Sequence, residues 1–319
     1  MFLKEITNGG TKMDRLTISA YEIMKKFPDE ETARIYLERK RWGDTPVCPE
    51  CGKSENQYKQ MRKGKAGYYL CYHCKLVYTV RTGTIFERSH VPLDKWLFAI
   101  YLVVTSRKGI SSLQLSKEIG TRQATAWFML QRIRTACQND KNDFLKGIVE
   151  ADETYIGGKE GNKHDIHKSY SGRGTVNKTA ILGMRERGGK VKAKVMKDTT
   201  AKSIHYELNS SIADDAILCT DDHRSYLGNR YTHMVVNHSA KQYVDGMAHT
   251  NSIESVWAVL KRGFYGIYHS FSNKHLQRYV NEFTYRLNEG NCAIHTMDRI
   301  DTLLNKAFGK RITYAELTA

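Results

Sequence analysis

Helical periodicity of the apolar residues dominates the first half of the chain. Residues 28–42 begin with acidic side chains and end with basic ones, the charge order that a helix dipole favours, so we expect one helix here. A second helix is predicted from Pro92 to about residue 105. Its apolar run, residues 96–104, is less than half the length needed to span a bilayer, and it is therefore expected to be a buried helix.

A pair of shorter helices is predicted around a turn at Gly120. Residues 111–120 form the first helical pattern, and Thr121 is expected to cap the second helix. The apolar residues of the second helix share one stripe: Ala126, Trp127, Leu130 and Ile133. This arrangement is typical of a helix-turn-helix, whose second helix begins with the residues that approach DNA. Those residues are Arg122, Gln123 and Thr125. Two packed helices without any groove contact remain an open alternative.

The pattern changes near Gly147, where predicted strands begin to alternate with helices. Residues 147–152 form a short strand that ends in acid, and residues 159–178 are polar, basic and glycine-rich, as expected of an exposed loop. The later predicted elements are a β-hairpin at 179–184 and 190–196, a helix at about 200–212, strands at 216–221 and 233–237, and further helices. This order favours the α/β class, with a mixed sheet and helices on its faces.

Four of the seven cysteines form two Cys-x-x-Cys pairs. They are Cys48, Cys51, Cys71 and Cys74. Their spacing matches a zinc ribbon, in which two short turns present four thiolates to one structural Zn²⁺. The basic, glycine-containing segment between the pairs, residues 58–69, is expected to be a hairpin stabilised by the metal. His73 is an alternative ligand, but it lies between two better-placed cysteines, so we expect four sulfur ligands.

The charge of the chain indicates a polyanionic partner. Its formal net charge over 319 residues is +16, and the Lys and Arg residues recur beside aromatic residues along the whole chain. Such side chains gain affinity by displacing counterions from phosphates, so we expect a nucleic-acid partner. The start of the chain lacks the apolar core of a secretory signal, and a cytoplasmic location is expected.

Two acidic residues end predicted strands. Asp152 and Asp221 follow buried strand patterns, and if these strands are neighbours, the two carboxylates meet at one edge of the sheet. Asp221 is preferred to Asp222 because it continues the alternation of its strand, although either residue fits a turn cap. Glu150 and Glu153 are left out of the site, since we expect both to face away from Asp152.

A third acidic residue, Glu254, is predicted on a helix. The buried stripe of this helix is expected to be Ile253, Val256, Trp257 and Leu260. Glu254 and Lys261 share a line along its flank, where a carboxylate can lean over a sheet edge and a lysine can hold a phosphate. In a purely structural alternative, Glu254 completes a capping box that starts at Asn251.

Carboxylates from three separate segments of a basic protein favour a two-metal site. Hard oxygen ligands suit Mg²⁺ or Mn²⁺, and a pair of such ions can activate an attacking oxygen and stabilise the leaving oxygen of a phosphodiester. The predicted ligands are Asp152, Asp221 and Glu254.

Three strings of residues resemble a known family. They are Asp152-Glu-Thr-Tyr-Ile-Gly-Gly158, Thr220-Asp-Asp-His-Arg-Ser-Tyr226, and His249-Thr-Asn-Ser-Ile-Glu-Ser-Val-Trp257 followed by Leu260-Lys-Arg262. The chain is similar to bacterial insertion-sequence transposases of the DDE type, in the group with an N-terminal zinc ribbon that is related to eukaryotic Merlin elements. The resemblance implies an RNase H-like catalytic domain, metal-dependent cleavage and strand transfer at terminal inverted repeats, and a homodimer or higher oligomer on double-stranded DNA.

The resemblance also implies roles for particular residues. The metal-binding triad falls on Asp152, Asp221 and Glu254, and Lys261, next to Arg262, falls on the lysine that contacts the DNA end. Members of this group can use Asn at the third position, so Asn251 is an alternative ligand, although helical phase favours Glu254. The expected parts of the chain are a partly disordered leader (1–24), a helix with the zinc ribbon (25–90), a helix-turn-helix-like segment (91–146), the catalytic domain (147–290) and a C-terminal helical tail (291–319).

Two other functional classes stay open at this point. A zinc-ribbon DNA-binding regulator without catalysis would need only the first half of the chain. A stand-alone RNase H-like nuclease would cut DNA without joining it. Neither accounts for the whole sequence as economically as a transposase does.

Overall fold

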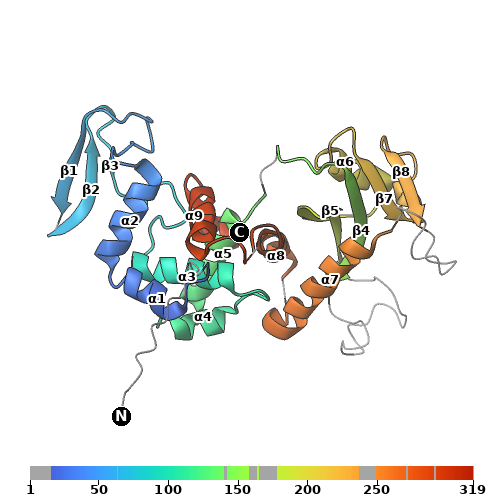
Figure 1. Ribbon diagram of the computed structural model, residues 1–319. Coiled ribbons are helices and arrows are strands. Elements are labelled where there is room, and N and C mark those ends of the chain that lie inside the picture. The colour runs from blue at the N-terminus through green and yellow to red at the C-terminus, as the bar shows by residue number, and fades with distance from the viewer. Residues whose placement is uncertain are drawn as a thin grey trace, which may run out of the picture.

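The computed structural model describes residues 16–62, 64–139, 142–157, 164, 178–236, 249–270, 272–290 and 292–318. Figure 1 shows a small hairpin sheet at one end, a group of helices in the middle, and a larger sheet crossed by α7 (Asn251–Gly263) at the other end. No helix within the described residues is long and apolar enough to cross a membrane. Most of the loop predicted at 159–178, and the first 15 residues of the predicted leader, lie outside these ranges.

The helices in the middle share one apolar core. They are α1 (Ala20–Lys26), α2 (Glu30–Trp42), α3 (Leu93–Thr105), α4 (Ser112–Glu118), α5 (Gln123–Ala136) and α9 (Thr296–Ala307). The short helix α10 (Tyr314–Thr318) lies outside this core and packs Tyr314 against Phe128 of α5. Trp96 of α3, Ile133 of α5 and Leu303 of α9 are all fully buried in this core. Burying a side chain of this size contributes about 1.5–3 kcal/mol each, which explains why α9, from the segment expected as a tail, is packed among the earlier helices.

Caps explain where these helices begin. Asp29 accepts the backbone N–H of Thr32 at 2.7 Å and starts α2, which confirms the helix predicted at 28–42. Ser19 and Glu22 form a capping box that starts α1 within the segment expected as leader. Thr121 is not the cap of α5: its hydroxyl is buried without a hydrogen bond, and Arg122 is the N-cap residue.

Two sheets make up the β-structure. The strands of the small sheet, all antiparallel, are β1 (Gln57–Arg62), β2 (Lys65–Cys71) and β3 (Val77–Tyr78). The strands of the larger sheet, in spatial order, are β6 (Val191–Val195), β5 (Thr179–Glu186), β4 (Ile148–Ile156), β7 (Ile217–Asp221) and β8 (Thr232–Val236). β4 is antiparallel to β5 and parallel to β7, and β7 is parallel to β8. The predicted mixed sheet and hairpin are therefore confirmed.

Helices cover both faces of the larger sheet. α6 (Ala201–Asn209) packs its Ile204 and Leu208 against one face, which includes Ala151 of β4. α7 and α8 (Leu276–Glu289) pack against the other face, which includes Ile181 of β5. Alternation along β4 thus separates residues that face α6 from residues that face α7.

One boundary differs from the prediction. β4 does not end at Asp152 but continues to Ile156, because β5 pairs with its second half, in the register Asp152 with Gly183 and Ile156 with Thr179. Asp152 therefore lies in the middle of a strand. The parallel pairing with β7 runs only as far as Glu150 and Cys219, so Asp152 lies just beyond it.

A buried ionic network joins the helical part to α8. Arg134 of α5 and Glu282 of α8 pair at 2.6 Å, with side chains only 2% and 1% exposed. Arg286 also pairs with Glu282, and the Tyr268 hydroxyl donates to it at 3.0 Å. A buried charge that loses its partner is strongly destabilising, so this network fixes α5 relative to α8.

Candidate active site

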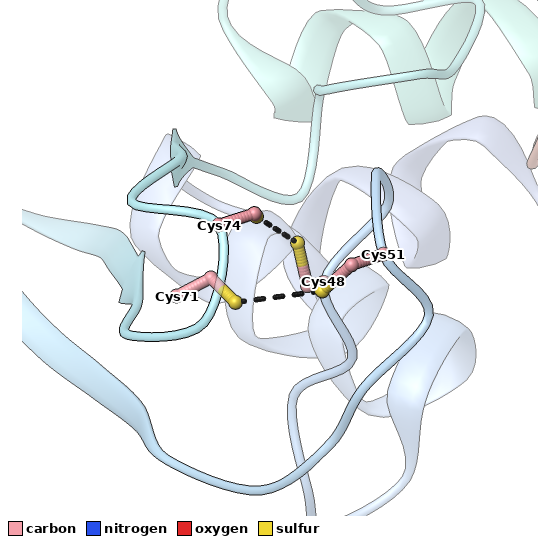
Figure 2. Close-up of side chains that lie close together, drawn as sticks. All are labelled: Cys48, Cys51, Cys71 and Cys74. Atoms are coloured by element: carbon pink, nitrogen blue, oxygen red, sulfur yellow. Dashed lines mark hydrogen bonds between the residues drawn. The ribbon is translucent and has the colours of Figure 1, made fainter.

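The structure brings the four predicted cysteines together (Figure 2). Cys48 Sγ lies 3.5 Å from Cys74 Sγ, and Cys51 Sγ lies 3.6 Å from Cys71 Sγ. All four sulfurs lie within 4.8 Å of one another, and His73 is exposed and outside the cluster. Four sulfurs about 2.3 Å from one tetrahedral ion would be about 3.8 Å apart, so this donor set fits one structural Zn²⁺.

The surroundings of the cluster also suit a metal. A hydrogen bond from the backbone N–H of Cys74 makes the largest contribution to lowering the pKa of the Cys71 thiol, to about 6. A lowered pKa favours the thiolate, which is the form that binds a metal. Trp42 of α2 packs edge-on against Tyr69 and Tyr78 of the hairpin sheet, with ring centroids 5.3 and 5.7 Å apart. These contacts attach the ribbon to α2.

The larger sheet places Asp152 and Asp221 on adjacent parallel strands. Each lies two residues beyond the paired residues Glu150 and Cys219, so the two carboxylates are at the same level. Burial and the neighbouring charge of Asp221 raise the pKa of Asp152 to about 6, and Glu254 adds to this effect. The charges of Asp221 and Glu254 thus both act on Asp152.

The α7 helix lies across this part of the sheet. Its buried residues include the whole predicted stripe, Ile253, Val256, Trp257 and Leu260. Trp257 Nε1 donates to Asp152 Oδ2 at 3.0 Å. Gly183, the β5 partner of Asp152, makes this approach possible, since a Cβ there would lie 2.3 Å from the Trp257 ring. Trp257, which we predicted only as core, therefore also fixes one oxygen of Asp152.

Glu254 and Lys261 are both exposed on the flank of α7, as expected. The structural alternative, a capping box that starts at Asn251, is wrong, because Thr250 is the N-cap residue and Asn251 is the first residue of the helix. The Thr250 hydroxyl donates to Glu254 Oε1 at 3.1 Å.

The ligand atoms of the carboxylate site are more widely spaced than those of the cysteine cluster. Among the described residues, the cysteines are the only group of three or more His, Cys, Asp or Glu whose ligand atoms all lie within 4.8 Å of one another. Asp152, Asp221 and Glu254 are all described, so at least one pair of these carboxylates is farther apart than that. Asp221 Oδ1 also accepts the backbone N–H of His223 at 3.1 Å, so the predicted turn cap exists at the same residue.

Two neighbouring glutamates do not share one orientation, contrary to our expectation. A two-residue period turns Glu150 to the same face as Asp152, towards α7, and only Glu153 to the opposite face. Burial raises the pKa of Glu153 to about 7, while the nearby Tyr226 hydroxyl lowers it. The two-residue period of a strand, applied correctly to the sequence, would have placed Glu150 on the same face as Asp152.

The residues predicted to bind DNA lie at the ends of two helices. Arg122 and Gln123 are exposed at the start of α5, and Thr125 is half-buried. Gln123 Nε2 donates to Ser112 Oγ of α4 at 2.7 Å, which ties the two helices of the pair together. Lys261 and its neighbour Arg262 are exposed in the last turn of α7.

Comparisons with known proteins agree with this arrangement. A family model described as the ISXO2-like transposase domain matches residues 144–288, and one described as the transposase zinc-ribbon domain matches residues 28–77. An uncharacterised protein in transposable element ISH50 of Halobacterium salinarum is 30% identical in an alignment 277 residues long, and the match covers 82% of this chain and 92% of that protein. The crystal structure of a pre-cleavage Mos1 transpososome covers 64% of this chain and 75% of its own, with 13% identity and a TM-score of 0.26, too low to support an inference.

The zinc ribbon, the mixed RNase H-like sheet and these matches define a transposase. The chain belongs to the ISXO2-like family of insertion-sequence transposases that carry an N-terminal zinc ribbon. A regulator without catalysis and a stand-alone nuclease are not favoured, because the transposase matches extend over both the ribbon and the sheet.

Proposed function

We propose that this transposase cleaves the terminal inverted repeats of its element and joins the freed ends to target DNA, using Asp152, Asp221 and Glu254 as catalytic metal ligands. One observation carries the proposal: Asp152 and Asp221 lie at the same height on adjacent parallel strands, and the helix that contains Glu254 packs across the same face of the sheet. When bound, the divalent ions would activate the attacking oxygen and stabilise the leaving oxygen.

The chemistry of the donor set supports two Mg²⁺ or Mn²⁺ ions. Carboxylate oxygens are the ligands that these cations prefer, and the raised pKa of Asp152 reflects burial and the negative charges of Asp221 and Glu254. A cation between these groups would relieve that repulsion. Trp257 would hold Asp152 in place by donating to Oδ2.

The basic residues suggest how DNA is held. In the proposal, Lys261 and Arg262 bind phosphates of the element end beside Glu254, since all three are exposed on α7. The ribbon domain (25–90) and the helix pair of the 91–146 segment, with Arg122, Gln123 and Thr125, would recognise the terminal repeat.

The catalytic domain would extend over 147–290, with a leader before residue 25 and a helical tail after 290. The active form would be a homodimer or higher oligomer on DNA, working in the cytoplasm beside the nucleoid.

Strand transfer of a labelled, pre-cut element end into a plasmid tests the proposal. The end sequence is taken from the DNA that flanks the gene, and the reaction is run with Mg²⁺ or Mn²⁺. We expect Asp152→Asn, Asp221→Asn and Glu254→Gln each to abolish joining, while Asn251→Ala retains it. If Asn251→Ala abolishes joining and Glu254→Gln does not, Asn251 is the third ligand. A wild-type protein that binds the pre-cut end but never joins it to the plasmid would contradict the proposal.

A further inference from the structure

The N-terminus of α7 is capped by a residue from a distant part of the chain. A helix begins with backbone N–H groups that lack partners within the helix, and a nearby side chain usually accepts them. The N-cap residue of α7, Thr250, makes no such side-chain hydrogen bond. Instead, Glu150 Oε2 of β4 accepts the N–H groups of Ser252 and Ile253, at 2.9 and 3.1 Å.

The other carboxylate oxygen of Glu150 is also held. Arg187, in the turn between β5 and β6, donates from Nε to Glu150 Oε1 at 3.0 Å and from Nη2 to the carbonyl oxygen of His249 at 3.3 Å. His249 Nδ1 lies 3.2 Å from the same Oε1. The Glu150 side chain is 0% exposed, and its negative charge is balanced by the Arg187 guanidinium and by the positive end of the helix dipole.

Glu150 and Asp152 are two residues apart on one strand and face the same helix. Asp152 accepts from Trp257 in the middle of α7, and Glu150 accepts from its first turn. These two contacts, made from one short stretch of β4, fix both the position and the rotation of α7. Glu254 lies between the two contacts along the helix, on its exposed flank.

We propose that Glu150 is a positioning residue of the active site: it fixes the start of α7 so that Glu254 is held at the distance from Asp152 and Asp221 that metal binding requires. The inference rests on the proposed function of these three acids. Glu150 itself is not a ligand in this scheme, because both its oxygens are already occupied within the protein. Outer-shell residues of this kind typically affect metal affinity by roughly 10- to 100-fold.

The nearly isosteric variant Glu150→Gln provides the test. The Gln amide cannot serve both sides: if its oxygen accepts from α7, its NH₂ group meets the Arg187 donor, and if it is turned over, the α7 amides lose their acceptor. Glu207→Gln on α6, on the opposite face of the sheet, is the matched control. The zinc-loaded proteins, bound to a pre-cut DNA end, are titrated with Mn²⁺, and free Mn²⁺ is measured by electron paramagnetic resonance.

We expect Glu150→Gln to raise the Mn²⁺ dissociation constant at least about 10-fold, with wild-type zinc content and end binding. Hydrogen exchange of the peptide that covers residues 249–257 should become faster, and the Mg²⁺ concentration for half-maximal joining should rise in parallel. Glu207→Gln should match wild type in all three measurements. A loss of folded protein alone would leave the Mn²⁺ affinity of the folded fraction unchanged.

A milder variant keeps the test decisive if Glu150→Gln does not fold. Arg187→Gln removes one donor to Glu150 from a partly exposed position, and it should raise the Mn²⁺ dissociation constant in the same direction by a smaller factor. Unchanged Mn²⁺ affinity in the folded variants, with wild-type joining intact, would overturn the positioning role alone. A wild-type protein that does not join DNA would instead contradict the proposed function.

Discussion

The cysteine cluster and the carboxylate site are assembled in different ways. Four sulfurs come from two tight turns, one before β1 and one at the end of β2, and lie within 4.8 Å of one another. The three carboxylates come from two strands and a helix, and their separation depends on how α7 packs on the sheet. A site made within one local motif is determined by spacing along the chain, whereas the acid site is determined by packing.

Loss of one sulfur should show most clearly that the two sites are assembled independently. We expect Cys71→Ser to lose the zinc and unfold the ribbon, since structural zinc contributes on the order of 10 kcal/mol to such folds. End binding should fall at least about 100-fold, while the larger sheet stays folded because its core contains no ribbon residue. Zinc analysis, limited proteolysis and end binding check this. Cys292→Ser, at an exposed cysteine outside the cluster, is the control, and a full loss of all helical structure in Cys71→Ser would contradict it.

Removal of one carboxylate should affect activity and stability in opposite directions. Asp152→Asn should lower joining at least about 1,000-fold and yet stabilise the Mg²⁺-free protein at pH 7. The pKa of Asp152 is raised to about 6 from 3.8, so the native state favours the protonated form. The protonated carboxyl therefore stabilises the native state; this stabilisation is complete below about pH 4 and is lost as the pH rises through about 6. At pH 7 the charged side chain costs about 1–3 kcal/mol, which Asn removes.

Urea unfolding in chelator-free buffer, with zinc bound and Mg²⁺ absent, measures this effect. The stability difference between Asp152→Asn and wild type should grow between pH 4 and pH 6, and added Mg²⁺ should stabilise wild type alone. Asp222→Asn, at an exposed neighbour of Asp221, should show neither effect. Equal stability of Asp152→Asn and wild type at every pH would exclude the proposed repulsion.

A methyl group should disturb the packing on which the acid site depends. In Gly183→Ala, the new Cβ would lie 2.3 Å from the Trp257 ring and 2.9 Å from Ile253, so α7 must move away from Asp152. A displacement of about 1 Å can lower a rate about 100-fold, and overpacking costs about 1–3 kcal/mol. Gly266→Ala, where a Cβ meets no atom within 4 Å, is the matched control. Joining, zinc content and thermal unfolding are compared. Full activity in Gly183→Ala would show that the acid site tolerates movement of α7.

The same contrast explains which features the sequence predicted. Cysteine spacing and strand alternation act over a few residues, so the ribbon, the mixed sheet and the buried stripe of α7 could be predicted. The length of β4 could not, because its second half is held by β5, which follows some twenty residues later and was not assigned as its partner. The cap of α7 could not either: the local pattern suggested Asn251, whereas the acceptor is Glu150, 102 residues away in the chain.

The smallest effect is expected from the exposed lysine at the far end of α7. Lys261 is solvent-exposed, and one phosphate contact is worth little at physiological salt. Lys261→Ala should weaken end binding only a few-fold at 0.1 M salt and reduce the slope of log affinity against log salt by about 1. Lys202→Ala, exposed on α6 behind the sheet, removes the same charge and should change neither the affinity nor the slope. Equal effects of both variants would mean that only overall charge matters, and that the acid site has no dedicated phosphate contact on α7.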